Sequence, residues 1–463
     1  MKGKIFIILM AVFLSIVFFT QFKLINKPVT DNDEGIYLTS FLLVDKGYSA
    51  YKQTYFSQPP GFLLSVYPGF ILFGKTLQAA RLTISLWSII GLLAILWLGF
   101  ELKNKWSGLL AVSLLLIIPT YYNQSLTFQS DILITTFSMI SFVGLIRYIK
   151  SHYIPWFIIS VFFLNLSLWT KFDITFIPSY ILILFFAFKE KEISLKKIIN
   201  LLIIFFTVGI GFFILLILPF GIREVFNNSI LLRFQAAETT SKAFLLVDYL
   251  KKDLILLSMI SAGLILSIFK IRKFNYLQKI IFIWSIFILI LLIFYRPLFS
   301  HHLAILVVPT VLLFSQVIGH YLINKYFFRS MTVIILAISL GMRIYLTIGS
   351  STKLVDNNQQ KAIEIIKEHT NPDEIIISDE EILSGLSGRL PPPELSDISY
   401  VRIRSNNLTP EDFKKIIYTY KPKLIIPWNG RLRLIKNFEE NLIGYKLLTS
   451  FSGDKNIYIR IAP

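Results

Sequence analysis

Long apolar segments fill most of the first 350 residues, and they limit the folds that this chain can adopt. A helix of about 20 apolar residues spans the hydrocarbon core of a bilayer, so each such segment is a candidate transmembrane helix. We expect these helices near residues 4–23, 80–100, 106–122, 128–148, 154–170, 172–188, 197–219, 253–270, 278–295, 302–322 and 330–349. The apolar stretch 59–73 is too short for a full crossing and is expected to lie in the interface. The pattern predicts a polytopic α-helical membrane protein with about eleven transmembrane helices.

The composition supports a bilayer environment and argues against nucleic acid as a partner. Charged residues make up 16% of the chain, whereas soluble proteins carry about 25%. The net charge is +18, but residues 351–463 hold 16 Lys and Arg against 15 Asp and Glu, which leaves 30 against 13 in residues 1–350. The excess therefore lies in short turns between apolar segments, which is the positive-inside pattern. The absence of cysteine excludes disulfides and thiolate metal sites.

The positions of the basic residues also predict the orientation in the membrane. The first apolar segment is longer than the core of a signal peptide and no small-residue cleavage site follows it, so we expect a retained helix with a cytoplasmic N-terminus. From there the alternation of sides gives one face six basic turns, which contain Lys2, Lys4, Lys103, Lys105, Arg147, Lys150, Lys189, Lys191, Lys196, Lys197, Lys270, Arg272, Lys273, Lys279, Lys325 and Arg329. We therefore predict a plasma-membrane protein whose C-terminus lies outside the cytoplasm.

From residue 351 onward the sequence has the character of a small soluble domain. Amphipathic and short apolar runs alternate with turn residues, which is typical of helices and buried strands. The runs are 359–368, 374–378, 423–427, 445–451 and 457–461, and Thr409-Pro410 forms a helix start. We predict an extracytoplasmic α/β domain at 351–463, after a transmembrane domain at 1–350.

The first outer loop, residues 26–60, is unusually acidic. It carries Asp31, Asp33, Glu34 and Asp45 directly after an apolar segment. Carboxylates at a membrane boundary are costly unless they are paired or hydrated, so they are candidates for a functional site. A solvated loop that happens to be acidic is the alternative.

Further charged residues fall at the same predicted rim. They are Asp131, Lys171, Asp173, Arg296, His301 and His302. Lys171 and Asp173 can form a pair that only caps two helix ends, and the two histidines can serve as interfacial anchors. The histidines together with an outer carboxylate can instead hold a divalent metal, although their spacing follows no regular ligand pattern. No Gly-rich phosphate loop is present, so no nucleotide cofactor is indicated.

The order of several short motifs resembles a known family of membrane enzymes. The motifs are Asp-Glu-Gly-Ile-Tyr-Leu at 33–38, Lys-Gly at 46–47, Gln-Pro-Pro at 58–60, Ser-Asp at 130–131, Thr-Lys at 170–171 and His-His-Leu-Ala-Ile-Leu-Val-Val-Pro at 301–309. Their order and predicted sidedness resemble GT-C glycosyltransferases, in particular protein O-mannosyltransferases and bacterial aminoarabinose transferases. The resemblance implies a GT-C-like bundle with a small C-terminal α/β domain.

The resemblance also implies transfer of a sugar from a polyprenyl-phosphate donor to a lipid, protein or glycan acceptor. The first-loop acid in such enzymes is similar in position to Asp33, which would act as the general base with support from Glu34. Asp131 would orient the acceptor or a metal. The donor phosphate would meet Lys171, Arg296, His301, His302 and Gln58. The chain departs from aminoarabinose transferases at Ser57-Gln58, where they carry an acidic-basic pair, so the metal and the sugar stay open.

Two other classes of protein remain as alternatives. A transporter or flippase of lipid-linked saccharides would explain many spans, but transporters often carry internal repeats and charges near mid-membrane. Here the charges lie at one rim and no repeat is visible. A polymerase or ligase of surface glycans would lack the acidic first loop.

Overall fold

The computed structural model describes residues 2–171, 177, 180–181, 194–231, 242–295, 298–322, 324–350 and 353–461. Contacts within the chain divide it into two compact units. The bundle unit comprises residues 1–25, 81–216 and 240–350, and the sheet unit comprises residues 26–80, 217–239 and 351–463. The predicted boundary near residue 350 stays a prediction, because the first outer loop packs in the unit that also holds the C-terminal residues.

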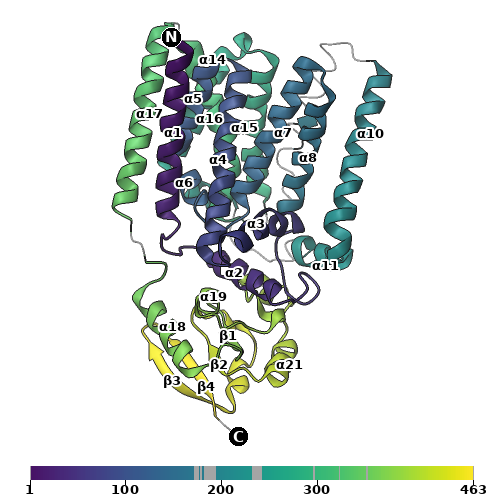
Figure 1. Cartoon of the computed structure of the whole chain (residues 1–463), viewed down its shortest axis with the longest axis vertical. Helices are drawn as coiled ribbons and strands as arrows, with labels where there is room; N and C mark the ends of the chain where they lie inside the picture. The colour runs from purple at the N-terminus through teal and green to yellow at the C-terminus, as the bar shows by residue number, and fades with distance from the viewer. Residues whose placement is uncertain are drawn as a thin grey trace. The chain divides into compact units, whose positions relative to one another are not determined.

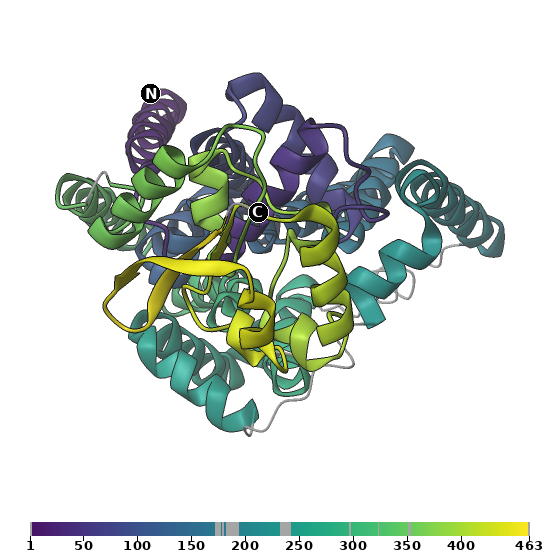
Figure 2. The ribbon, with the colours of Figure 1, turned by 90° about the horizontal axis from the view of Figure 1, so that it is seen from below.

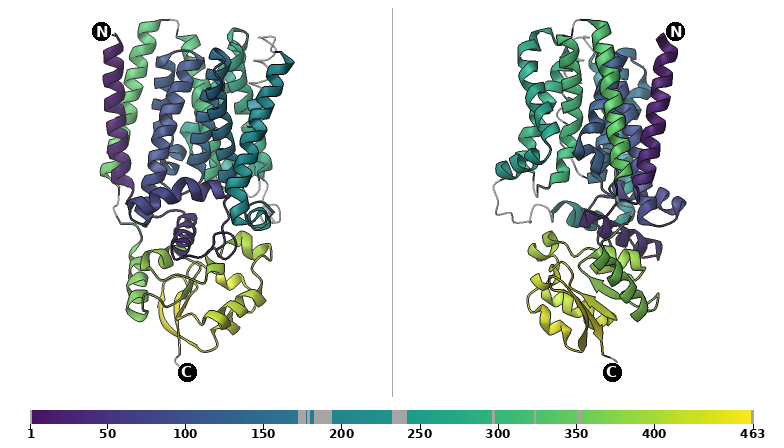
Figure 3. Two further views of the ribbon diagram at one scale, coloured as in Figure 1. Left: turned by 45° about the vertical axis from the view of Figure 1, so that its right-hand side comes forward. Right: turned by 90° about the vertical axis from the view of Figure 1, so that its left-hand side faces the viewer.

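The bundle unit consists of helices that lie side by side (Figures 1 and 3). They are α1 (Lys2–Leu24), α4 (Leu77–Leu102), α5 (Lys105–Ile117), α6 (Pro119–Gln124), α7 (Asp131–Ser151), α8 (Ile154–Lys171), α10 (Leu195–Phe212), η1 (Phe213–Ile217), α13 (Lys242–Lys252), α14 (Leu254–Lys270), η4 (Ile271–Lys273), α15 (Tyr276–Phe294), η5 (Ser300–Leu303), α16 (Ala304–Tyr321) and α17 (Lys325–Ile348). The end-on view in Figure 2 shows α1 at one edge of the bundle with α17 beside it.

Nine helices in the described part of the chain are long and apolar enough to cross a membrane. This finding confirms a polytopic helical membrane protein. Of the eleven expected spans, the one at 106–122 corresponds to the shorter helix α5, and the one at 172–188 lies largely outside the described residues. The buried helices are α7 and the α16 segment, of whose apolar windows 89% and 83% is buried, whereas only 17% is buried at Lys196–Phe220. The first two therefore form the core, and the last presents its apolar side chains outward to lipid.

Basic turns from distant parts of the sequence meet at one end of the bundle. The Lys105 ammonium lies 4.8 Å from the Phe6 ring, and the Arg329 guanidinium lies 5.7 Å from the Trp106 ring. Lys150 forms an ion pair with Glu101 at 2.7 Å. These contacts join turns that the sequence pattern assigned to a single side.

The sheet unit contains a four-stranded sheet with the order β1-β2-β4-β3. The strands are β1 (Ile376–Ser378), β2 (Leu424–Ile426), β3 (Tyr445–Phe451) and β4 (Lys455–Arg460). β1 pairs with β2 in parallel, while β4 runs antiparallel to both β2 and β3. The helices around it are α18 (Asn357–His369), α19 (Glu381–Ser387), α20 (Tyr400–Arg404) and α21 (Pro410–Tyr420). The expected helix start is confirmed, because Thr409 and Asp412 form a capping box on α21.

Two helices from the first outer loop also belong to the sheet unit. They are α2 (Asn32–Asp45) and α3 (Pro60–Phe73), and α3 has 14 residues, which is short for a crossing. Shorter helical segments complete the unit: η2 (Leu218–Phe220), α11 (Ile222–Phe226) and η3 (Asn227–Leu231). The helix α2 packs against α19 of the C-terminal part. The acidic segment is therefore a well-packed helix rather than a solvated loop.

Candidate functional site

The predicted base, Asp33, lies in the first turn of α2. Asp31 is the N-cap of this helix, and its carboxylate accepts a hydrogen bond from the Asp33 backbone N–H at 3.0 Å. Asp33 is half-buried, whereas Glu34 is fully buried. Both carboxylates occupy the positive end of the helix dipole, which stabilises their ionised forms. Of the three acids, Asp31 has a structural task and Asp33 is the more accessible of the remaining two.

Gly35 and Asp45 have structural roles that the sequence did not reveal. Gly35 lies inside α2, where a Cβ would come within 2.5 Å of the Ile382 backbone nitrogen. Its small size thus allows α19 to pack closely. Asp45 is at the far end of α2, about 18 Å along the axis from Asp33 at 1.5 Å per residue, and pairs with Lys75 at 2.7 Å. Asp45 therefore does not belong to the acidic group at 31–34.

Gln58 links the first outer loop to the face of α2. Its side-chain nitrogen donates to the Tyr37 hydroxyl at 2.7 Å, and its backbone oxygen accepts from the Tyr51 hydroxyl at 2.5 Å. Gln58 is 5% exposed. Its expected contact with a donor phosphate remains a prediction, and the observed bonds hold the Pro-Pro turn beside α2.

The same loop is fixed to residues near the C-terminal sheet. The Ser396 hydroxyl and the Tyr55 backbone form two mutual contacts at 3.1 Å, and the Arg402 guanidinium lies 4.2 Å from the Tyr55 ring. The Tyr55 hydroxyl donates to the Asn228 carbonyl at 3.2 Å. Three distant stretches of sequence are joined around the segment that carries Asp33.

In the bundle unit, Lys171 and Asp131 form a buried ion pair. The distance between Lys171 Nζ and Asp131 Oδ1 is 2.5 Å, and each side chain is 2% exposed. Asp131 is the first residue of α7 and Lys171 is the last of α8. Each charge is therefore opposite in sign to the helix dipole at its own end, which is favourable. The alternative pairing of Lys171 with Asp173 stays a prediction, because Asp173 lies outside the described residues.

Two histidines lie beside this ion pair. Asp131, His301 and His302 each place a possible ligand atom within 4.8 Å of the other two. Two imidazole nitrogens and a carboxylate oxygen fit a divalent transition metal such as zinc. However, His302 Nδ1 accepts the Phe299 backbone N–H at 3.1 Å, so the neutral ring carries its proton on Nε2. In this tautomer the Nε2–H can donate to an oxyanion. Metal binding through Nε2 requires the other tautomer, in which the proton is on Nδ1.

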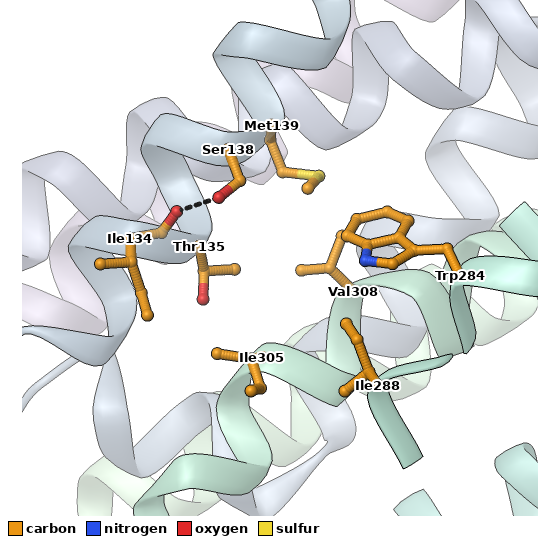
Figure 4. Close-up of a pocket in the computed structure, with 8 residues that line it drawn as sticks. All are labelled: Ile134, Thr135, Ser138, Met139, Trp284, Ile288, Ile305 and Val308. Atoms are coloured by element: carbon orange, nitrogen blue, oxygen red, sulfur yellow. Dashed lines mark hydrogen bonds between the residues drawn. The ribbon is translucent and has the colours of Figure 1, made fainter. Parts of the chain in front are cut away.

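An apolar pocket adjoins the Asp131 and His301 ends of their helices. Its lining residues come from α7, α15 and α16: Ile134, Thr135, Ser138, Met139, Trp284, Ile288, Ile305 and Val308. Thr135 and Ile305 face each other across it, each one helical turn from Asp131 and His301 (Figure 4). The cavity is small, about 10 Å³, which is close to the space that one water molecule needs. The Trp284 indole N–H is buried and meets no acceptor among the described residues, so one polar group is available to a guest.

Sequence reasoning missed this pocket, although part of its signal was present. The i+4 spacing from Asp131 and from His301 along their helices leads to Thr135 and Ile305. Nothing in the sequence brings Trp284 to the same place. Arg296, which we predicted at this rim, lies outside the described residues, so its role stays a prediction.

Comparisons with known proteins support the fold. Residues 57–222 match the family described as dolichyl-phosphate-mannose-protein mannosyltransferase. A search of curated protein sequences gives no match. The structure of ArnT from Cupriavidus metallidurans bound to undecaprenyl phosphate is similar over 100% of this chain and 98% of that one, with a TM-score of 0.69 and 13% identity.

Archaeal structures are similar as well. The Archaeoglobus fulgidus oligosaccharyltransferase in complex with zinc and sulfate has a TM-score of 0.56 at 12% identity, over 97% of this chain and 73% of that one. Oligosaccharyltransferase AglB from the same organism, in complex with an inhibitory peptide and a dolichol-phosphate, has a TM-score of 0.52 at 11% identity, over 94% and 72%. At identities of 11–13%, the structural similarity is evidence for the fold alone. The resemblance to GT-C glycosyltransferases of the mannosyltransferase and ArnT type is confirmed.

Proposed function

We propose that this chain is a glycosyltransferase that moves a hexose or pentose from a polyprenyl-phosphate donor to a lipid, protein or glycan acceptor. The observation that carries the proposal is the buried Lys171–Asp131 pair with His301 and His302 beside it, next to an apolar pocket between helices. A prenyl phosphate has the same two parts, a charged head and an apolar chain. The similar structures of ArnT and AglB contain molecules of this class, undecaprenyl phosphate and a dolichol-phosphate.

The charged cluster is suited to the phosphate. Lys171 keeps donor capacity beyond its bond to Asp131, and the protonated His302 Nε2 supplies a second donor. Charge-assisted hydrogen bonds from buried cations are the strong ones, and they stabilise the phosphate most as it leaves with an added negative charge. Asp131 holds the lysine in place for this task. Arg296 would add a further cation.

We place the part of the prenyl chain next to the phosphate against the apolar wall of this pocket, which must widen to admit it because the cavity is small. Its wall is mostly aliphatic, and it begins one turn below Asp131 and His301. Burial of apolar chain surface contributes roughly 25 cal/mol per Å². Binding energy from this remote part of the donor can fix the position of the reacting carbon.

Asp33 is the proposed general base. Its carboxylate accepts the proton of the acceptor hydroxyl while that oxygen attacks the anomeric carbon of the sugar. The bond between this carbon and the phosphate oxygen breaks, and its electron pair leaves with the prenyl phosphate. The half-buried position of Asp33 at the start of α2, with Asp31 engaged as the N-cap, supports this choice. Glu34, fully buried beside it, supports its orientation.

A divalent metal is compatible with the same cluster. Asp131, His301 and His302 would hold it, and the ion would supply positive charge to the donor phosphate.

The activity is tested with purified protein and a panel of polyprenyl-phosphate sugars. Release of free prenyl phosphate is the readout, and we expect it with at least one donor in the presence of an acceptor. A transporter would move the donor between leaflets of a vesicle without releasing the phosphate, so that result would replace the enzyme by the alternative.

Asp33→Asn tests whether Asp33, rather than a neighbouring acid, is the base. The amide keeps the shape of the side chain and removes the base, so turnover should fall roughly 100- to 10,000-fold while donor binding survives. Asp248→Asn, at a partly exposed surface acid paired with Lys252, is the control and should leave turnover unchanged. Near-normal turnover in Asp33→Asn together with a loss in Asp31→Asn would move the role to Asp31.

We also propose a cytoplasmic N-terminus and an extracytoplasmic C-terminal domain in the plasma membrane. The meeting of the basic turns at one end of the bundle supports this orientation. Reporter fusions at Lys273 and after residue 461 should report opposite sides of the membrane. If both fusions report the same side, the C-terminal domain does not lie outside the cytoplasm.

A further inference from the structure

A second polar cluster lies in the bundle unit, away from the proposed donor site. It occupies the end of the bundle that also holds the start of α1, where Lys105 meets Phe6 (Figure 1). Lys103 comes from the turn between α4 and α5, Gln278 from the first turn of α15, and Gln316 and His320 from the last turns of α16.

Hydrogen bonds through this cluster have a fixed direction. The Asn275 backbone N–H donates to Gln278 Oε1 at 3.2 Å, which sets the orientation of that amide, and His320 Nε2 approaches the same oxygen at 3.2 Å. Gln278 Nε2 must then donate to Gln316 Oε1, at 3.2 Å. The series ends at Gln316 Nε2, which is buried and meets no acceptor in the described part of the chain. Gln316 is 1% exposed, so water does not readily replace that acceptor.

A second donor without an acceptor lies close to the first. Lys103 Nζ is buried and has no hydrogen-bond partner among the described residues. It lies over Gly319, where a Cβ would come within 2.7 Å of it. Gln316 and Gly319 are three residues apart on α16, so they share one helix face with about 5–6 Å between Cβ positions. Burial lowers the pKa of Lys103 to about 8.

The surroundings add positive charge. The charges of Lys103, Lys270 and Lys273 all act on the ring of His320. The carboxylate nearest in sequence, Glu101, already accepts from Lys150, Arg147 and Trp97. Among the residues that the structure describes, the cluster therefore offers unsatisfied donors and cations and has no anion to pair with them.

We propose that this cluster binds the phosphate of an anionic lipid headgroup, with Lys103 Nζ and Gln316 Nε2 donating to its oxygens. Helix ends of a membrane bundle lie at the headgroup layer, and basic pockets between helices there bind lipid phosphates. Exposed apolar side chains beside the cluster, such as Phe269 and Tyr321, offer contact to the acyl chains. The proposal is independent of glycosyl transfer.

The test measures lipid binding by the purified full-length protein. The protein is placed in bilayer discs of phosphatidylcholine with or without phosphatidylglycerol, and its thermal unfolding and bound lipid are recorded. We expect phosphatidylglycerol to raise the midpoint and to be retained on the protein. Lys103→Met and Gln316→Met should each weaken this effect about tenfold, because each removes one donor to an ionised group. Lys103→Arg should keep most of it.

Lys279→Met is the matched control, because Lys279 is an exposed lysine next to Gln278 on the same rim. It should change lipid binding less than about twofold. A loss as large as that of Lys103→Met would show diffuse attraction to the rim and would overturn the site. If Lys103→Met does not fold, Gly319→Val keeps the charge and displaces the lysine, and it should weaken binding as much.

Inorganic phosphate separates the two sources of the same chemistry. In phosphatidylcholine discs, millimolar phosphate should leave the unfolding midpoint unchanged. An equal rise with phosphate alone would identify a free anion as the ligand and overturn the lipid assignment. No response to either probe would overturn the anion site.

Discussion

Two ion pairs in this chain have the same length and very different surroundings. Lys171–Asp131 in the bundle unit and Arg431–Glu381 in the sheet unit each have a nitrogen–oxygen distance of 2.5 Å. All four side chains are at most 4% exposed. Burial of two charges is costly in both cases, so their neighbours decide what each pair does.

The sheet-unit pair is saturated with hydrogen bonds. Arg431 Nε donates to Asn429 at 3.0 Å, and its terminal nitrogen also contacts the Asp379 carbonyl. Glu381 Oε1 accepts the Ile398 backbone N–H at 3.0 Å. The pair joins the segments that follow β1 and β2, at the carboxyl ends of two parallel strands. It therefore connects these two segments of the sheet unit.

The bundle-unit pair keeps unused capacity. The described residues give Lys171 a single acceptor, Asp131, and two imidazoles stand within reach of that carboxylate. The two pairs therefore differ in function although their distances are equal. The Arg431–Glu381 pair is part of a hydrogen-bond network, and the Lys171–Asp131 pair leaves donors for a phosphate. Three substitutions test this contrast.

The largest expected effect is on the stability of the sheet unit. Above about pH 8, where Glu381 is ionised, Arg431→Met leaves this buried carboxylate without its cation, which should destabilise the fold by about 3–5 kcal/mol. Thermal or denaturant unfolding of the purified protein measures it. Arg433→Met, two residues along and only partly buried, is the control and should cost less than about 1 kcal/mol. Equal stability of both variants would show that the Arg431–Glu381 pair has no structural role.

Lys171→Met should affect the donor more than the fold. Asp131 keeps His301 and His302 beside it, and the His302 Nε2–H can donate to its carboxylate in place of the lysine. Loss of a charge-assisted hydrogen bond should weaken donor use by about 1.5–3 kcal/mol. The measurement is the apparent affinity for the prenyl-phosphate sugar, with the exposed Lys325→Met as control. An unchanged affinity would leave the pairing with Asp131 as the whole role of Lys171.

The smallest effect is a change in the pH dependence of stability. Burial raises the pKa of Glu381 to about 8, although Arg431 opposes the shift. The folded state therefore holds a proton that the unfolded chain releases near pH 4.5, and stability should fall as pH rises from about 5 to 8. The glutamine in Glu381→Gln has no titratable group. The unfolding midpoint of this variant should therefore not decrease between about pH 5 and 8. Parallel pH profiles for both proteins would contradict the raised pKa.

Local patterns predicted much of the fold. Apolar runs of helical length gave the spans, and the basic turns grouped the loops at one end of the bundle. The cap at Thr409 and the short strands of the C-terminal part depend on neighbouring residues alone, so they could be read directly. The same holds for the accessible acid at the start of α2.

Contacts between residues that are far apart in the sequence could not be predicted from these local patterns. The sequence does not show that Lys171 contacts Asp131, which is 40 positions away. Glu381 and Arg431, 50 positions apart, look like ordinary surface charges in the sequence. Gly35 shows the same limit, because only the packed α19 reveals why a side chain does not fit there.

The packing of α2 on α19 has a consequence for biosynthesis. The Thr39 hydroxyl donates to the Glu381 carbonyl across 342 positions, so the segment that carries Asp33 is finished only after the last part of the chain has been made. At roughly 5–20 residues per second, the ribosome needs about 20–70 seconds to cover that distance. The packing of α2 is therefore incomplete until α19 has been made. We expect protease to cut α2 in a chain that ends at residue 350 and to spare it in the full-length protein.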